Sequence, residues 1–397
     1  MKYLVLIGDG MADYPIGEIE GMTVLQYART PNMDYIADNG INGLSQTVPE
    51  GMAPGSDVAN MSILGYDPEK YYSGRAPLEA ASMGIVLEKD DVAFRCNLVT
   101  LKDDILEDYS AGHISTELAE KLINSIDSDI GSESIRFYAG MNYKHLLLLK
   151  DRKGIEAVCT PPHDIMGQEW ELYLPHGKDG EFLSKIIRRT HGILSGHPVN
   201  IERIKNREKP ANSVWLWGQG YAPAFPKFKQ LYGLNSAVIS AVDLVKGIGI
   251  YAGFDVIEVP GATGYFDTDY RAKAEYAIKA LEDHDIVFVH VEAPDEAGHI
   301  GSIEEKIKAI ENFDQKVVGT ILSNILASDG EYTVLITADH PTPISLRTHT
   351  TDPVPFAIYS TSLTEKDNVS AFDEDSASNG SMRTVRASNL IKILLEL

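Results

Sequence analysis

Apolar runs that end in turns alternate with helix-like segments along much of the chain. YLVLIGDG (3–10) predicts a buried strand, and TPNMDYIADNG predicts a short helix closed by Gly40. Late in the chain, HDIVFVHVEAP (284–294) and EYTVLITADHP (331–341) are continuous apolar strands, and the segment between them has helical spacing. Unbroken apolar strands alternating with helices indicate a mostly parallel sheet with helices on both faces.

The middle of the chain has a different pattern. From about residue 86 to about residue 220 the expected elements are shorter and turns are frequent, as in CTPPHDIMGQEW. We expect residues 86–220 to form a smaller α+β domain, inserted into an α/β core made of residues 1–85 and 221–397. Near the C-terminus, AFDEDSASNGSMR is polar and predicts a surface loop, and ASNLIKILLEL predicts a last helix.

Composition narrows the choice of partners. The net charge of −23 argues against nucleic acid, whose phosphates demand a positive face. An anionic substrate would need local cations. Cys96 and Cys159 are too few for a disulfide framework or a thiolate metal cluster. No run approaches the roughly 18 apolar residues of a membrane span, and the first apolar run lacks a cleavage site, so we expect a cytoplasmic protein. Nothing in the sequence indicates an oligomeric state.

Carboxylates and imidazoles follow three of the expected strands. In an open parallel sheet, ligands gather at the carboxyl ends of the strands, so these side chains should share one edge. One more histidine follows the last of these strands, in a loop stiffened by two prolines. The side chains are Asp9, Asp295, His299, Asp339, His340 and His349.

One hydroxyl stands where a stiff loop, residues 48–55, meets a helix that begins near Ser56. For Ser56 alone, a helix N-cap is favoured over a nucleophile by about three to one. Asp9 could likewise be a turn residue, and Asp339 a helix cap. The ordered set of all these residues is what favours chemistry.

Three aspartates crowded together would repel one another unless cations compensate them. Mixed Asp and His ligands suit ions of the Mn²⁺, Zn²⁺ or Mg²⁺ class, and seven ligands are too many for one ion. Two ions fit, and a cation-held hydroxyl becomes a nucleophile for in-line attack at phosphorus. One ion would take Asp9, Ser56, Asp339 and His340, and the other would take Asp295, His299 and His349.

The ordered motifs resemble the alkaline phosphatase superfamily, and more closely the compact archaeal type of cofactor-independent phosphoglycerate mutases. They are LIGDGMAD, APGSDVANMSILGYDP, GRAPLEAASMGI, CTPPHDI, EAPDEAGHIG, ITADHPTP and HTTDPVPF. The resemblance implies an α/β, alkaline-phosphatase-like core and an inserted domain that clamps the substrate. It also implies the two-metal assignment, with Mn²⁺ expected first and Zn²⁺, Co²⁺ or Mg²⁺ as alternatives, and Ser56 as the phosphoryl acceptor.

The resemblance further implies substrate contacts. His113 resembles the histidine that acts on the phosphate or the leaving hydroxyl, and Asp164 resembles the acid–base carboxylate. Lys246 stands where the longer mutases have a phosphate-contacting lysine, and Arg75 follows the Ser56 motif as a further anion contact. For Arg75 and Lys246, an ordinary surface residue is an equally good interpretation.

The expected reaction is the metal-dependent interconversion of 3-phosphoglycerate and 2-phosphoglycerate. A phosphoserine forms on Ser56, the glycerate reorients, and Asp164 or His113 deprotonates its other hydroxyl. The sequence departs from the longer mutases at Trp215 and Trp217, where those enzymes carry arginines. The alternatives are therefore a phosphotransferase acting on another small alcohol such as homoserine, a phosphohydrolase, or a non-catalytic metal-bound module.

Overall fold

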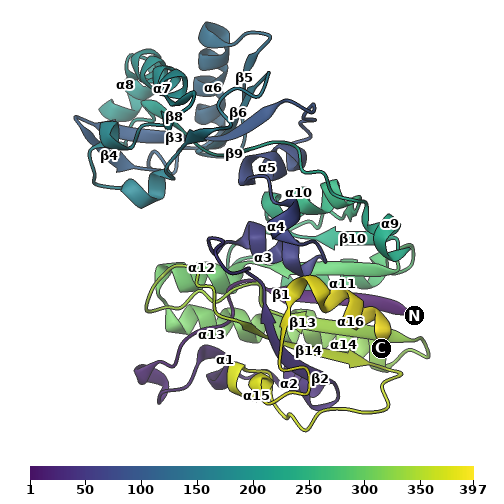
Figure 1. Cartoon of the computed structure of the whole chain (residues 1–397). Helices are drawn as coiled ribbons and strands as arrows, with labels where there is room; N and C mark the ends of the chain where they lie inside the picture. Colours follow the sequence, from purple (N-terminus) through teal and green to yellow (C-terminus); the bar gives the residue numbers. More distant parts are fainter. The chain divides into compact units, whose positions relative to one another are not determined.

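The computed structural model describes residues 1–397. The chain forms two compact units, of which the first contains both termini (Figure 1). The first unit consists of Met1–Tyr72 and Ala224–Leu397, and the second of Ser73–Pro223.

An eight-stranded sheet forms the centre of the first unit, in the order β11-β10-β12-β1-β13-β14-β2-β15. Only β14 runs antiparallel to its neighbours, and the other pairs are parallel. The strands are β1 (Lys2–Gly8), β2 (Ile41–Gln46), β10 (Ser236–Ile239), β11 (Asp255–Val256), β12 (Ile286–Val291), β13 (Tyr332–Thr337), β14 (Val354–Ser360) and β15 (Thr384–Arg386).

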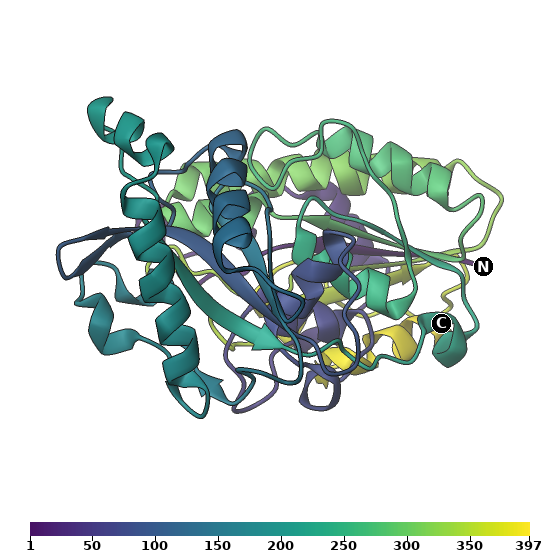
Figure 2. The same ribbon diagram turned by 90° about the horizontal axis from the view of Figure 1, so that it is seen from above.

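Helices cover both faces of this sheet. They are α1 (Val24–Tyr27), α2 (Pro31–Asp38), α3 (Ser56–Ile63), α4 (Pro68–Tyr71), α9 (Phe228–Tyr232), α10 (Asp243–Ala252), α11 (Tyr270–Ala280), α12 (Ala293–Ile300), α13 (Ile303–Asn312), α14 (Gly319–Leu326), α15 (Glu374–Ser378) and α16 (Leu390–Glu396). A π-helical stretch, Phe313–Val318, joins α13 to α14. In Figure 2 the light green helices of residues 270–326 run along one side of the sheet.

The burial of β1 explains why it reads as a continuous apolar run. Leu4 and Leu6 belong to the core shared with α2, α11, α13 and α14, while Val5 and Ile7 alternate toward the opposite face. All four side chains are buried, and α10 and α16 contact the neighbouring strands β10 and β13. A central parallel strand therefore has no polar face, as the sequence indicates.

The register of the parallel strands gathers the chemistry at one edge. Ile7 of β1 lies beside His290 of β12 and beside Thr337 of β13. The chain leaves all three strands at the same edge, so the residues that follow them are neighbours despite their distance in sequence. Asp9 follows β1, α12 with Asp295 follows β12, and Asp339 follows β13.

The second unit is built on an antiparallel sheet in which β3 pairs with β4, β6 and β9, and β5 pairs with β6. Its strands are β3 (Val92–Lys102), β4 (Ile105–Asp108), β5 (Ile135–Tyr138), β6 (Lys144–Leu149), β7 (Ala157–Val158), β8 (His176–Gly177) and β9 (Ser213–Gly220). Its helices are α5 (Arg75–Ser82), α6 (Thr116–Ile130), α7 (Gly180–Ser195) and α8 (Pro198–Lys205). The α/β core and the smaller α+β unit confirm the predicted fold class.

The structure divides the chain at residues 73 and 223, where the sequence analysis expects 86 and 220. The larger difference has a physical cause, because α5 packs on β3 and β9 of the second unit. Gly74 also approaches the backbone of β9 so closely that a Cβ there would lie 2.2 Å from the carbonyl oxygen of Gln219. Neither contact is visible in a local pattern.

The segment AFDEDSASNGSMR is not the surface loop that its polarity predicts. It contains α15, whose N-terminus is capped by the Asp373 carboxylate accepting from the Ser376 N–H. Phe372 and Ala377 are buried, and α15 contacts β2 and β14. Two apolar side chains are therefore enough to anchor an otherwise polar helix. None of the helices of the structure is both long enough and apolar enough to span a membrane.

His145 makes the stability of the second unit depend on pH. Burial lowers its pKa to about 3 from the ordinary 6.5, and its Nδ1 accepts from the Gly140 N–H at 3.0 Å. The folded pKa lies below the unfolded one, so this stability is complete above about pH 6.5 and is lost as the pH falls toward 3. At about pH 5 the loss is about 2 kcal/mol.

We expect His145→Asn, which keeps an acceptor and does not titrate, to remove about 2 kcal/mol of the difference in unfolding free energy between about pH 7 and pH 5. All three tryptophans lie in this unit, so their fluorescence during urea unfolding measures it. His176→Asn, at an exposed position, is the control. The same pH dependence in both variants would contradict the role of His145.

Candidate metal centre and nucleophile

The first group of candidate ligands comprises Asp9, Asp339 and His340, whose ligand atoms all lie within 4.8 Å of one another. His340 Nε2 is 3.5 Å from Asp9 Oδ1 and 3.5 Å from Asp339 Oδ2. All three residues are almost completely buried. Their positions are set by the turns that immediately follow β1 and β13, and the Gly10 N–H donates to Asp339 Oδ1 at 3.0 Å.

The electrostatics of this group call for a cation. Asp9 Oδ1 is buried and has no hydrogen-bond partner. Burial raises the pKa of Asp9 well above its usual range, and the carboxylates of Asp339, Asp295 and Glu292 raise it further. A divalent ion would occupy the unpaired oxygen and offset this repulsion, so the donor set fits a hard or borderline metal ion.

Ser56 is the first residue of α3, and Gly55 is the N-cap. The Ser56 side chain therefore does not cap the helix; its Oγ lies 3.1 Å from His340 Nε2. Asp57, the next residue, accepts from the Val58 N–H at 3.0 Å and from the Tyr72 hydroxyl at 2.5 Å. Asp57 thus fixes the start of the helix, and Ser56 is free to face the first group.

The second group comprises Asp295 and His299 on α12 together with His349. Asp295 Oδ2 is 3.2 Å from His299 Nε2, and Asp295 Oδ1 is 3.4 Å from His349 Nε2. The two Nε2 atoms are themselves 3.0 Å apart. His299 Nδ1 lies 3.0 Å from the Arg347 carbonyl oxygen, which can only accept, so this nitrogen carries a proton and Nε2 faces its neighbours.

The side chains of the second group strongly shift one another's pKa values. Burial acts to raise the pKa of Asp295, but hydrogen bonds from His299 and His349 hold it well below its usual range. Burial likewise acts to lower the pKa of His299, yet the Asp295 hydrogen bond and charge raise it to about 9. A metal ion at this position would replace a proton between these side chains.

The two groups are direct neighbours. The rings of His340 and His349 stack with their centroids 3.9 Å apart. The structure thus brings together Ser56 and all six predicted Asp and His ligands, in the two sets that the sequence analysis assigns. Their role as ligands remains a prediction.

The sequence analysis missed Asn60 and His290, which both contact the first group. Asn60 Nδ2 donates to Asp339 Oδ2 at 2.8 Å and to the Ser56 carbonyl at 3.0 Å. The signal for Asn60 is its spacing of one helical turn from Ser56. His290 Nε2 lies 3.2 Å from Asp9 Oδ2, and burial lowers the pKa of His290 to about 4. His290 sits within an apolar run and gives no such signal.

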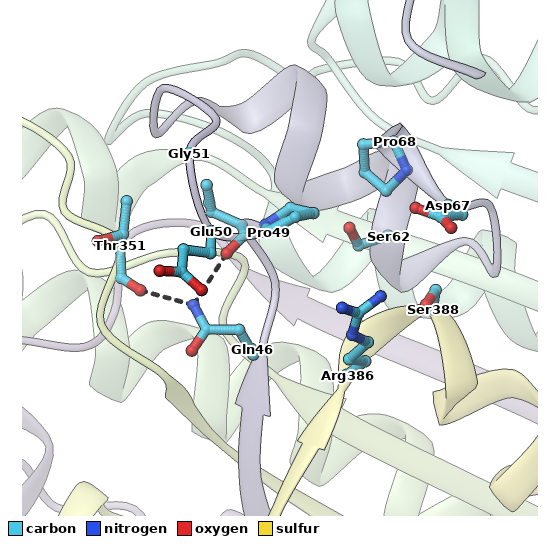
Figure 3. A pocket seen from close by; sticks show the side chains of 11 residues that line it. Gln46, Pro49, Glu50, Gly51, Ser62, Asp67, Pro68, Thr351, Arg386 and Ser388 are labelled. Atoms are coloured by element: carbon cyan, nitrogen blue, oxygen red, sulfur yellow. Dashed lines mark hydrogen bonds between the residues drawn. The ribbon is translucent and has the colours of Figure 1, made fainter. Parts of the chain in front are cut away.

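The loop before Ser56 is tied to the segment after His349. Gln46 Nε2 donates to the carbonyls of Val48 and Thr351 at 2.9 and 2.7 Å. Figure 3 shows this amide at the wall of a cavity of about 480 Å³. None of the candidate ligands lines this cavity, so it is separate from the two ligand groups.

Three predicted substrate residues belong to the second unit. His113 is exposed, with a left-handed backbone at φ 51°, and its ring lies edge-on to Tyr143. Asp164 is exposed and lies 3.7 Å from His163 Nε2. Arg75 Nε is 3.2 Å from Glu79 Oε1.

Lys246 belongs to the first unit, on α10. Its Nζ donates to both carboxylate oxygens of Glu258, at 2.8 and 2.9 Å. The Lys246 side chain is only 15% exposed. The charge of Lys246 is therefore paired within the first unit. This ion pair is compatible with both interpretations of Lys246, as an ordinary structural residue and as a phosphate contact.

Both tryptophans of β9 have structural partners. Trp215 Nε1 donates to the Thr160 carbonyl at 2.8 Å, and Trp217 Nε1 donates to Asn97 Oδ1 at 3.2 Å. The Arg95 guanidinium lies 4.2 Å above the Trp217 ring, because β3 pairs with β9 at these two residues. β9 itself has no arginine, and Arg95 of the neighbouring strand lies beside Trp217, a contact that the sequence analysis did not find.

Arg95 and Arg75 share one carboxylate. Arg95 Nε is 2.9 Å from Glu79 Oε2, while Arg75 takes the other oxygen. Burial acts to raise the pKa of Glu79, but the two guanidinium charges keep it below its usual range. The Glu79 carboxylate is therefore held between two arginine side chains.

Two neighbouring Asp/His groups beside a serine hydroxyl, at the carboxyl edge of a mostly parallel sheet, form the kind of centre that metal-dependent phosphoryl-transfer enzymes use. The comparisons with known proteins name a family within this class. The family model for 2,3-bisphosphoglycerate-independent phosphoglycerate mutase matches residues 37–200. A relative with that name from Methanosarcina acetivorans is 61% identical over 396 residues, which cover 100% of both chains.

Solved structures agree with this result. A protein from Pyrococcus horikoshii is 32% identical, with a TM-score of 0.85, over 100% of this chain and 96% of that one. A cofactor-independent phosphoglycerate mutase from Thermoplasma acidophilum is 29% identical, with a TM-score of 0.67, over 100% of this chain and 99% of that one. The chain belongs to the 2,3-bisphosphoglycerate-independent phosphoglycerate mutase family, and the resemblance seen in the sequence is confirmed.

The two-group arrangement predicts the effect of removing one carboxylate. We expect Asp295→Asn to lower the content of tightly bound divalent ion from about two per chain to about one, because only the second group loses its anionic ligand. Elemental analysis after dialysis against Mn²⁺ measures this content. Asp283→Asn, at an exposed position near the start of β12, is the control. Two ions retained by Asp295→Asn would contradict the assignment.

Proposed function

We propose that this chain interconverts 3-phosphoglycerate and 2-phosphoglycerate through a phosphoserine on Ser56, at a centre that takes two divalent ions. Family membership supports the reaction and the small phosphorylated substrate. One observation supports the role of Ser56: its Oγ faces the first ligand group, 3.1 Å from His340 Nε2. A serine that merely capped α3 would turn its oxygen to the helix N–H groups instead.

The proposed ligands divide as the structure groups them. Asp9, Asp339, His340 and Ser56 would hold one ion, and Asp295, His299 and His349 the other. When bound, the ions supply positive charge that lowers the pKa of the hydroxyl and stabilises the transferring phosphoryl group. Mn²⁺ is our first expectation, and the same oxygen and nitrogen donors also admit Zn²⁺, Co²⁺ and Mg²⁺.

The chain's own residues prepare the first transfer. The Asn60 side chain donates hydrogen bonds to both the Ser56 carbonyl and the Asp339 carboxylate. These bonds keep the nucleophile close to a proposed metal ligand. The first turn of α3 directs its N–H groups toward the same region as Ser56, where phosphate oxygens would accept from them. Ser56 Oγ then loses its proton to solvent and attacks phosphorus in line, while the bond from phosphorus to the glycerate oxygen breaks and that oxygen takes a proton from His113 or Asp164.

The second transfer reverses the first at the other hydroxyl of glycerate. We assign its deprotonation to Asp164 or His113, both of which are exposed and available to a substrate. Arg75 and Arg95, which share Glu79, would neutralise the substrate's anionic groups. The second unit must close over the site during this step, because water that reached phosphoserine would turn the mutase into a phosphatase.

The nucleophile assignment predicts that Ser56→Ala lowers mutase turnover by more than about 10³-fold. An enolase-coupled assay on metal-stripped protein, with each cation added back, measures turnover. Mass spectrometry of acid-quenched protein should find one phosphoryl group on the wild type and none on the variant. Ser62→Ala is the matched control, because that hydroxyl lies on the same helix and donates to the Val58 carbonyl. Turnover by Ser56→Ala would refute the role.

Substitutions of Lys246 and of its partner Glu258 can show whether Lys246 binds substrate or only forms a structural ion pair. If Lys246 binds the phosphate, Lys246→Met should raise KM for 3-phosphoglycerate about tenfold with little change in kcat. Glu258→Gln should leave KM unchanged or lower it, since it releases the ammonium group from its carboxylate partner. An equal rise in KM in both variants would show that only the ion pair matters.

A further inference from the structure

Thr342 places one hydroxyl between the two ligand groups. The residue is fully buried, and its Oγ1 lies 2.5 Å from Asp295 Oδ1 and 3.2 Å from His340 Nδ1. An ionised carboxylate can only accept, so the single hydroxyl hydrogen is donated to Asp295. The hydroxyl oxygen is then left to accept, and the hydrogen between Thr342 and His340 must come from His340 Nδ1.

This bond selects one tautomer of His340. With the proton on Nδ1, the Nε2 atom keeps its lone pair, and this is the atom that faces Ser56 Oγ at 3.1 Å and Asp9 Oδ1 at 3.5 Å. A metal ligand needs that form of the ring. The same hydroxyl fixes the rotation of the Asp295 carboxylate, whose two oxygens meet His299 and His349.

The position of Thr342 depends on two glycines. A Cβ at Gly10 would lie 2.7 Å from Thr342 Oγ1, and one at Gly298 would lie 2.5 Å from the Thr342 carbonyl oxygen. Both distances are too short for a real Cβ atom. Thr342 can therefore occupy this position only because residues 10 and 298 are glycines without a Cβ. Gly10 follows β1 and Gly298 lies on α12, so each ligand-bearing segment provides part of the space.

A buried ion pair holds the backbone of Thr342. Lys306 Nζ donates to the Thr342 carbonyl at 2.9 Å, to the Ala12 carbonyl at 3.2 Å and to Asp13 Oδ2 at 2.7 Å. The ammonium group thus has three acceptors and is completely buried. Because Ala12 and Asp13 belong to the segment after Asp9, Lys306 ties Thr342 to the other side of the centre.

We propose that Thr342 is a positioning residue whose one hydroxyl sets the His340 tautomer and the Asp295 orientation together, and so couples the binding of the two metal ions. The inference rests on the proposed two-ion centre. The Thr342 hydroxyl contacts Asp295 and His340, and it acts only through these two side chains.

Two substitutions at this position isolate the hydroxyl. Thr342→Val keeps the shape and removes the oxygen, whereas Thr342→Ser keeps the oxygen and removes a methyl group. Calorimetric titration of the metal-stripped proteins with Mn²⁺ alone gives the dissociation constant of each ion. We expect Thr342→Val to weaken both ions by about 10–100-fold, the usual effect of removing a partner of metal ligands, and Thr342→Ser to stay within about threefold of the wild type.

The outcomes separate the inference from the proposed function. A wild-type protein that binds fewer than two Mn²⁺ ions would refute the two-ion centre itself. Two ions in the wild type with unchanged binding in Thr342→Val would overturn only the role of Thr342, as would the loss of a single ion. A purely structural role would lower the melting temperature of the metal-free variant and leave its Mn²⁺ affinities unchanged.

A second measurement does not depend on any Thr342 variant. Nitrogen NMR of the wild-type protein with labelled histidine reports which ring nitrogen of His340 carries the proton, and His340→Asn assigns the signal. We expect the proton on Nδ1 in the metal-free protein near neutral pH. A proton on Nε2 would overturn the proposal even if Thr342→Val failed to fold.

Discussion

The repulsion among buried carboxylates at the carboxyl edge of β1, β12 and β13 is the constraint on which the rest of the site depends. The parallel register forces Asp9, Asp295 and Asp339 together, and burial makes their charges costly. The protein leaves Asp9 Oδ1 without a partner, although buried polar atoms are normally hydrogen-bonded. A cation would resolve both problems at once, and the surrounding imidazoles are placed where its remaining ligands would be.

Neutral donors hold this arrangement and limit how far it can relax. Asn60 and the Gly10 N–H bond Asp339, and the Thr342 hydroxyl bonds Asp295. Each of these donors comes from a different segment, so the ligand geometry is set by tertiary contacts around the edge of the sheet. Such support keeps a centre rigid and lets the nucleophile approach along one line. The position of Ser56 is a consequence of the same network, because Asn60 also bonds its carbonyl.

In a chain of net charge −23, two arginines of the second unit lie close together. Arg95 lies on the ring of Trp217 and shares Glu79 with Arg75. Arg95 thus places a guanidinium beside Trp217, although β9 itself has no arginine. The chain belongs to a family in which relatives that match its full length are named phosphoglycerate mutases.

The sequence by itself determined the buried strands, the helices between them, and the order of the candidate ligands from Asp9 to His349, because apolar periodicity and residues at strand ends are local signals. Only the tertiary structure decided that Ser56 faces His340, that α5 belongs to the second unit, and that the polar segment near the C-terminus contains α15. It also decided which side chains His290, Thr342 and Arg95 contact. These depend on contacts between residues that are far apart in the chain, and such contacts arise from packing and strand register, which no local pattern encodes.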